Sequence, residues 1–170
     1  MTVKALLPPV PLPLPPAGKI LNPLLALVMT TMRRRHGAVF DRLSGLGGKR
    51  VRIEPTSLPF AFLLTLAPTS AGARLRLADP RDMADAVIRG PLAVLLDLLE
   101  GRLDGDALFF SRLLTIEGDT EVILALRNAV DGEDIDLAAD LASPFGPLAG
   151  PAAQAFGVAK TILFGRRPTS

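Results

Sequence analysis

The chain has 170 residues, which is the size of one domain and is long enough to bury a core of its own. Cysteine is absent, which excludes disulfides, thiolate nucleophiles and cysteine-ligated metal centres. His36 is the single histidine, so a metal site built from several histidines is also excluded. Hydrophobic residues make up 49% of the chain and aromatic residues only 5%, which indicates a large aliphatic core or an apolar cavity.

Charge is distributed unevenly, although the net charge is only +2. Residues 1–76 hold eleven Lys and Arg residues against Asp41 and Glu54, whereas residues 77–170 hold eight against fifteen Asp and Glu residues. Two interpretations stay open: the first half meets an anionic surface, or the two halves neutralise each other within the fold. As an external surface, a membrane fits better than nucleic acid, because no aromatic residues are interleaved with the arginines.

No segment is expected to span a bilayer. The longest apolar stretch of the first half, residues 20–32, is shorter than the roughly 20 residues required and contains Asn22 and Pro23. A signal peptide is not expected either, because prolines interrupt the region that would have to be apolar. The sequence therefore predicts a cytoplasmic protein that associates with membranes peripherally.

The first elements are an arm and two helices. Residues 1–18 contain prolines at 8, 9, 11, 13, 15 and 16, which favour a polyproline II arm. Asn22 is expected to cap a helix that begins at Pro23. The apolar side of this helix would carry Leu24, Leu25, Leu27, Val28 and Met32, with Arg33, Arg34 and Arg35 at its end. A second short helix is expected over residues 38–43.

Four apolar segments follow, at residues 51–54, 60–66, 74–77 and 84–89. Three of them alternate apolar with charged side chains, and 60–66 is continuously apolar. This pattern is typical of an antiparallel sheet with one buried face. Pro91 should then open a helix over 92–99 whose leucines cover nearly its whole circumference, with Gly101 just past its end.

The next elements predicted are a strand at residues 113–117, a turn at Gly118–Asp119 and a helix. Asp119 is expected to cap this helix, which carries Val122, Ile123, Leu126 and Val130 on one side. The order of elements predicts an α+β fold, in which helices pack on one side of an antiparallel sheet.

The polar residues offer little for catalysis, and the chain is predicted not to be an enzyme. The cluster of Arg112, Glu117, Asp119 and Glu121 is interpreted as structural, because Asp119 caps a helix and Glu121 complements its dipole. No serine lies in a GxSxG elbow, and His36 follows three arginines that should hold it in solvent. The acidic run of residues 131–136 lacks the register of a calcium loop, so no metal is expected.

The most distinctive stretch is DGDALFFSRLLTIEGDTEVILALRN, residues 104–128. With the preceding IRGPLAVLLDLLEGRLDGD of residues 88–106, it resembles the sterol carrier protein type two domain, in which strand, leucine-rich helix, Phe-containing link and Gly-Asp turn follow in this order. More narrowly, LFFSRLLTIEGDTE of residues 108–121, with Arg127–Asn128 beyond it, is similar to the bacterial UbiT family.

This resemblance implies a lipid-binding domain over residues 19–143 whose sheet and helices enclose a hydrophobic tunnel. Residues 144–170, with a helix expected in 151–164, would close or flank the cavity. UbiT proteins are accessory factors of oxygen-independent ubiquinone biosynthesis. The resemblance therefore implies a polyprenylated ubiquinone precursor as ligand, the iron–sulfur hydroxylase pair of that pathway as partners, and no other cofactor. A generic phospholipid, fatty-acyl or sterol carrier with the same fold is the alternative.

Two sets of candidate site residues follow. The candidates for the cavity wall share apolar side chains on the predicted strands and helices: Phe60, Phe62, Leu64, Leu92, Leu95, Leu96, Leu99, Phe109, Phe110, Leu114, Ile116, Ile123 and Leu126. The candidates for membrane contact combine cations with apolar bulk: Arg33, Arg34, Arg35, Phe156, Ile162, Leu163 and Phe164.

Overall fold

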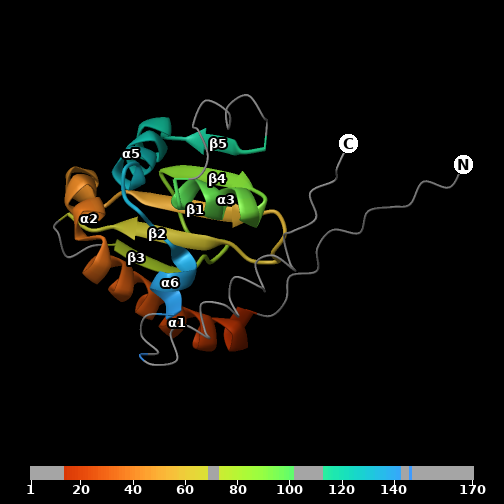
Figure 1. Ribbon diagram of the computed structural model, residues 1–170. Helices are drawn as coiled ribbons and strands as arrows, with labels where there is room; N and C mark the ends of the chain where they lie inside the picture. Colours follow the sequence, from red (N-terminus) through yellow and green to blue (C-terminus); the bar gives the residue numbers. More distant parts are fainter. Residues whose placement is uncertain (1–13, 69–72, 102–112, 143–145, 147–170) are drawn as a thin grey trace, which may run out of the picture.

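The computed structural model describes residues 14–68, 73–101, 113–142 and 146 (Figure 1). Its elements, in chain order, are α1 (Leu14–Arg35), α2 (Gly37–Leu43), a 3-10 turn (Ser44–Leu46), β1 (Arg50–Pro55), β2 (Phe62–Leu66), β3 (Ala73–Leu77), β4 (Ala86–Gly90), α3 (Leu92–Leu99), β5 (Thr115–Gly118), α5 (Thr120–Val130) and α6 (Leu137–Ala142). The boundary expected between residues 18 and 19 falls inside α1.

The five strands form one open sheet in the order β3-β2-β1-β4-β5. The pairs β1–β2, β2–β3 and β4–β5 are antiparallel, but the central pair β1–β4 is parallel. The α+β fold is thus confirmed, whereas the expectation of a purely antiparallel sheet was wrong. Alternation reveals which face a side chain occupies but not strand direction, and β4 reaches β1 only after the chain has passed through the β2–β3 hairpin.

The register gives the sheet two different faces. Val51 of β1 lies opposite Leu64 of β2 and Ala86 of β4, and this face packs against the helices in the main hydrophobic core. Residues one position along lie on the opposite face, where Arg52 is opposite Leu63. This second face carries the charged side chains of the strands, but it is not simply open to solvent, because Leu63 on it is only 1% exposed.

The charged face carries its own ion pairs. Glu54 accepts hydrogen bonds from Arg52 Nε and Arg89 Nε, both at 2.8 Å. Burial raises the pKa of Glu54, but the hydrogen bonds from Arg89 and Arg52 outweigh it, so its pKa is lowered overall. Charges on this face of the sheet are therefore paired between strands that lie side by side.

Helix α1 lies along β3, the edge strand of the sheet (Figure 1). Ala78 N donates to Ala61 O, so the preceding amide, Leu77 N, is turned away from β2. That amide donates to Asn22 Oδ1 over 2.8 Å. The expectation that Asn22 caps a helix was therefore wrong: α1 continues through Pro23, and the Asn22 side chain bonds to the sheet edge instead.

The turn into α5 follows the prediction. Gly118 has φ +81°, and Asp119 Oδ1 accepts from the amides of Glu121 and Val122 at the start of the helix. Lys49 adds an ion pair to Asp119 at 3.0 Å, which the sequence had not indicated. The hydrogen bond between them lowers the pKa of Asp119 and raises that of Lys49. The cap is thereby tied to the segment that leads into β1.

His36 contradicts its expected position in solvent. It is only 9% exposed, in the break between α1 and α2, and its Nε2 lies 2.8 Å from Oδ2 of buried Asp140 in α6. Glu133 lies on the other side of the ring, 3.9 Å from Nδ1. The three arginines before it did not determine its environment, because Gly37 starts a new helix and the turn directs the imidazole inward.

The uneven charge is in part neutralised within the fold. Four cations of the first half each pair with a carboxylate of the second half, at 2.7 to 3.1 Å: Arg35 with Asp140, Arg42 with Glu133, Lys49 with Asp119 and Arg76 with Asp82. These pairs support the interpretation of internal neutralisation. The exposed Arg34 at the end of α1 takes part in none of these four pairs.

Candidate functional site

A small apolar pocket lies between the buried face of the sheet and helices α3 and α5. Its volume is about 160 Å³. Ten of its lining residues are aliphatic and one is charged: Val51, Ile53, Leu64, Ile88, Leu95, Leu98, Leu99, Ile123, Leu126, Val130 and Arg127. Such a pocket favours hydrocarbon, because its walls offer dispersion contacts and exclude unpaired polar groups.

Three layers of structure position this lining. The floor comes from neighbouring strands, where Val51 and Leu64 lie opposite each other in the register. Helix α5 contributes Ile123, Leu126, Arg127 and Val130, whose spacing of three, four and seven residues places them on one side of a helix. Helix α3 forms the remaining wall. The pocket is therefore fixed by the sheet on one side and formed by two helices on the other.

Helix α3 is apolar almost all round, as its sequence predicted, yet none of its side chains is fully buried. Leu99 at its C-terminal end remains 37% exposed. A helix of this composition normally has its whole surface covered. Helix α3 is thus a wall whose outer side meets solvent and whose inner side meets the pocket.

The predicted cavity residues are only partly brought together. Leu64, Leu95, Leu99, Ile123 and Leu126 line the pocket. Leu96, Leu114 and Ile116 pack against the core cluster instead, and Leu92 is half-buried without lining the pocket. Phe60 and Phe62 contact each other edge to face, with ring centroids 5.6 Å apart, and do not line the pocket. Phe109 and Phe110 lie outside the described residues.

Reasoning from sequence missed six lining residues: Val51, Ile53, Ile88, Leu98, Arg127 and Val130. The alternation in 51–54 and 84–89 showed which strand residues face inward, but not which strands lie at the centre. The parallel pairing of β1 with β4 places Ile53 directly opposite Ile88. The position of Arg127 could have been predicted from the sequence, because it follows Ile123 by four residues and so lies on the apolar side of its helix.

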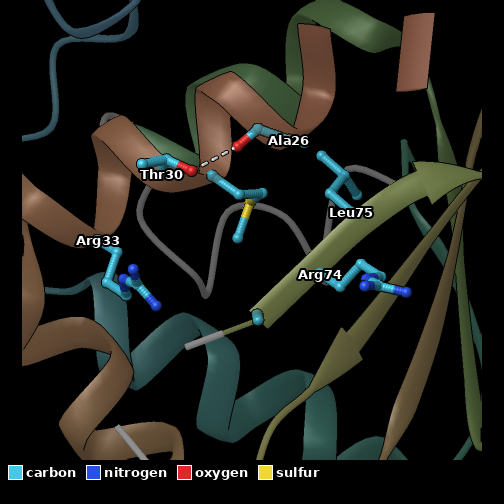
Figure 2. A pocket seen from close by; sticks show the side chains of 7 residues that line it. Ala26, Thr30, Arg33, Arg74 and Leu75 are labelled. Carbon is cyan, nitrogen blue, oxygen red and sulfur yellow. Dashed lines mark hydrogen bonds between the residues drawn. The ribbon is translucent and has the colours of Figure 1, made fainter. Parts of the chain in front are cut away.

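A second, more polar groove of about 180 Å³ lies between α1 and β3 (Figure 2). Arg33 and Thr30 line it from the helix, and Arg74 and Leu75 line it from the strand. Thr30 Oγ1 donates to Ala26 O of its own helix over 2.8 Å. Figure 2 shows the guanidinium groups of Arg33 and Arg74 well apart, so the two cations do not converge on one point.

The membrane-contact candidates within the described residues lie at the end of α1. Arg33, Arg34 and Arg35 are all exposed there, and Arg35 also binds Asp140. The apolar residues expected beside them pack inward in part, since Met32 is only 8% exposed. Phe156, Ile162, Leu163 and Phe164 lie outside the described residues. Within that described part of the chain, no helix is both long and apolar enough to cross a bilayer.

The carboxylates considered for acid–base chemistry have structural roles. Asp119 caps α5 and pairs with Lys49, and Glu117 on β5 lies 3.7 Å from Arg89. Among residues 14–68, 73–101 and 113–142, no group of three metal-ligating side chains is present. The pocket that the structure describes is a place to hold an apolar molecule, with no cluster of reactive groups among its lining residues.

A small α+β domain whose helices press an aliphatic pocket against one face of an open sheet has the architecture of a carrier of apolar ligands. Residues 30–131 match the model of the SCP-2 sterol transfer family. This span is more than half of the chain, and the chain belongs to the SCP-2 sterol transfer family.

Two solved structures are similar to this chain, and the first of them shows the same fold. One is described as "UbiJ-SCP2 Ubiquinone synthesis protein"; it is 23% identical over 71% of this chain and 93% of its own, with a TM-score of 0.51. Sterol carrier protein 2 from Yarrowia lipolytica is 11% identical over 71% of this chain and 94% of its own, with a TM-score of 0.44. No protein of curated function matches the chain.

Proposed function

We propose that this protein binds polyprenylated precursors of ubiquinone and presents them to the hydroxylases of oxygen-independent ubiquinone biosynthesis. The observation that carries the proposal is the aliphatic pocket between the sheet, α3 and α5, in a chain of the SCP-2 family. The UbiT-like sequence of residues 108–121 supports the choice of ligand, as does a structural relative named for ubiquinone synthesis. In this role the enzymes supply the chemistry, and the protein supplies solubility and orientation.

The size of the pocket sets a condition on this function. Sites for small organic ligands usually have volumes of about 300–1,000 Å³, and the pocket has about 160 Å³. A long isoprenoid chain gains about 0.8 kcal/mol for each buried methylene, which favours a larger enclosed volume. No side chain of helix α3 is fully buried, so this helix is the wall that we expect to move to provide it. The expected tunnel would form as α3 moves away from the sheet.

A generic carrier of phospholipid, fatty acid or sterol is the second candidate. The family takes its description from sterol transfer, and an aliphatic pocket binds any of these chains. The identity of the lipid distinguishes the two proposals. Lipid extracted from purified protein should contain prenylated aromatic compounds by mass spectrometry if the first is correct. Phospholipid alone, recovered from cells rich in quinone, would support the second.

Membrane association forms part of the proposal and draws on α1. Ile20, Leu24 and Leu27 are 73%, 51% and 44% exposed. Their spacing of four and three residues places them on one side of the helix. The exposed Arg34 follows seven residues after Leu27, so it continues this apolar stripe. An apolar stripe that ends in cations suits the interface of an anionic bilayer, where the apolar side chains insert and the cations meet headgroups.

The pocket itself is tested by a matched pair of substitutions. Leu99 lines the pocket and Leu124 does not, yet both are leucines at helix surfaces, 37% and 50% exposed. Leu99→Asp should lower lipid binding at least tenfold, because a carboxylate in the aliphatic wall would lose its hydration when a hydrocarbon chain binds beside it. Leu124→Asp should leave binding unchanged. Equal binding by both variants, with thermal unfolding as the check on folding, would remove α3 from the site.

A further inference from the structure

Arg127 is the single charged residue among those that line the apolar pocket. It lies in the last turn of α5, four residues after Ile123 and three before Val130, on the side of the helix that faces the sheet. An aliphatic residue at this position would complete a continuous hydrocarbon wall. The pocket is instead interrupted at one point by a cation.

The surroundings of Arg127 differ from those of its neighbours. Arg42 packs near the same end of α5, and its guanidinium has two partners: Nη1 donates to Ala129 O over 2.8 Å and Nη2 lies 3.1 Å from Glu133. Arg35 likewise pairs with Asp140. For Arg127, no carboxylate within the described parts of the chain lies at ion-pair distance.

The geometry of an arginine side chain places its charge at the edge of such a pocket. The methylene stem packs on apolar surface while the guanidinium stays in contact with water. The negative end of the α5 dipole favours a cation in this turn, but it does not occupy the guanidinium donors. A guanidinium offers five donors in a planar fork that matches a carboxylate or a phosphate with two parallel hydrogen bonds.

We infer that Arg127 selects lipids with an anionic head, a carboxylate or a phosphate, whose hydrocarbon chain occupies the pocket. This inference rests on the proposed lipid-binding function and adds to it the chemical class of the head. The chain supplies affinity through its contacts with the aliphatic wall. The ion pair at the rim fixes the head at the mouth and favours acids over uncharged lipids with the same chain.

The test compares two lipids that differ only in the head. Oleate and oleyl alcohol, each below its aggregation threshold, are titrated against the full chain loaded with a polarity-sensitive fluorescent fatty acid, and the displacement constants are compared. The native protein should bind oleate about tenfold or more tightly than oleyl alcohol, as expected for a charge-assisted bidentate pair. Arg127→Gln should bring the ratio of the two displacement constants close to one, while Arg127→Lys should retain part of the preference.

Arg74→Gln is the matched control. It removes one exposed positive charge from β3, outside the apolar pocket, and should preserve the preference for oleate. Acetate and inorganic phosphate should not displace the probe, because they carry the head without the chain. Unchanged preference in Arg127→Gln would overturn the inference and leave lipid binding intact. Failure of the native protein to bind either lipid would overturn the proposed function as well.

Discussion

The imidazole of His36 and the carboxylate of Asp140 lie 2.8 Å apart, between Nε2 and Oδ2, although 104 residues separate them in the chain. Both groups are buried, and Arg35 Nε contacts the other oxygen of Asp140 at 3.0 Å. This contact joins α6 to the break between α1 and α2. The one histidine of the chain thus has a structural role in holding its last described helix against its first two.

Replacing Asp140 should therefore destabilise the fold. Asp140→Ala leaves His36 buried without its partner, and an unsatisfied buried polar group costs about 1–3 kcal/mol. The free energy of unfolding, measured by urea titration at pH 7, should fall by this amount. Asp41→Ala, at an exposed position in α2, should change it little. Equal effects of the two substitutions would show that the His36 contact contributes nothing to stability.

Gly118 should not tolerate a side chain. Its φ of +81° is unfavourable for any residue with a Cβ, by about 1–2 kcal/mol. A Cβ added there would also overlap the carbonyl oxygen of Asp85. Gly118→Ala should therefore lower the free energy of unfolding by more than the cost of the positive φ alone. Gly45→Ala, where a Cβ meets no atom within 4 Å, is the control, and comparable melting temperatures for the two would contradict this prediction.

Asp82 should make the stability of the fold depend on acid pH. Arg76 donates to both of its carboxylate oxygens, at 2.7 and 2.8 Å, and the amide of Asp79 donates at 2.6 Å. The hydrogen bonds from Arg76, followed by that from Asp79, lower the pKa of Asp82 from 3.8 to about 2. Since the folded pKa is depressed, the contribution to stability is complete above the unfolded value and is lost as pH falls through about 2.

Carbon-13 NMR titration of the Asp82 carboxyl provides the direct measurement. Urea midpoints between pH 5 and 2 provide a second one, in which Asp82→Asn should flatten part of the decline seen in the native protein. A carboxyl of Asp82 that titrates near 3.8 would show that the contacts with Arg76 and Asp79 do not persist in solution.

The stripe on α1 should mediate binding to anionic vesicles. Leu24→Gln with Leu27→Gln should lower sedimentation with vesicles of phosphatidylglycerol at all salt concentrations, since apolar insertion is lost. Arg34→Gln should lower it mainly at low salt, because the Debye length shrinks from about 10 Å at 0.1 M to about 3 Å at 1 M. Met83→Gln, at a position 71% exposed elsewhere on the surface, is the control. Equal binding by all variants would exclude α1 as the contact surface.

Local signals predicted the elements that depend on a few adjacent residues. The helix over 92–99 has the bounds expected from Pro91 and its leucines, and Asp119 caps α5 as Gly118 indicated. Both are governed by backbone geometry and hydrogen bonds within one turn. The helix through Pro23 was missed because a proline inside a helix costs about 3 kcal/mol on its own. Packing of α1 on the sheet and the bond from Leu77 to Asn22 offset that cost.

The candidate site was harder to predict because it depends on contacts between distant segments. Leu95 and Ile123 were found because each lies on the apolar side of a helix. Ile53 and Ile88 were missed because only the parallel pairing of their strands brings them together. Arg127 was missed because it was interpreted as part of a family motif, and its chemistry depends on facing the sheet beside an aliphatic wall.

The bond between Asn22 and Leu77 also bears on how copies of this chain behave toward one another. A bare edge strand offers its amides and carbonyls to any other strand, which is the usual start of intermolecular β-pairing and fibril growth. Here α1 occupies the outer side of β3, and the opposite edge strand, β5, has only four residues. Proteolytic or engineered loss of α1 would therefore expose β3 to pairing with strands of other copies and favour aggregation through this edge.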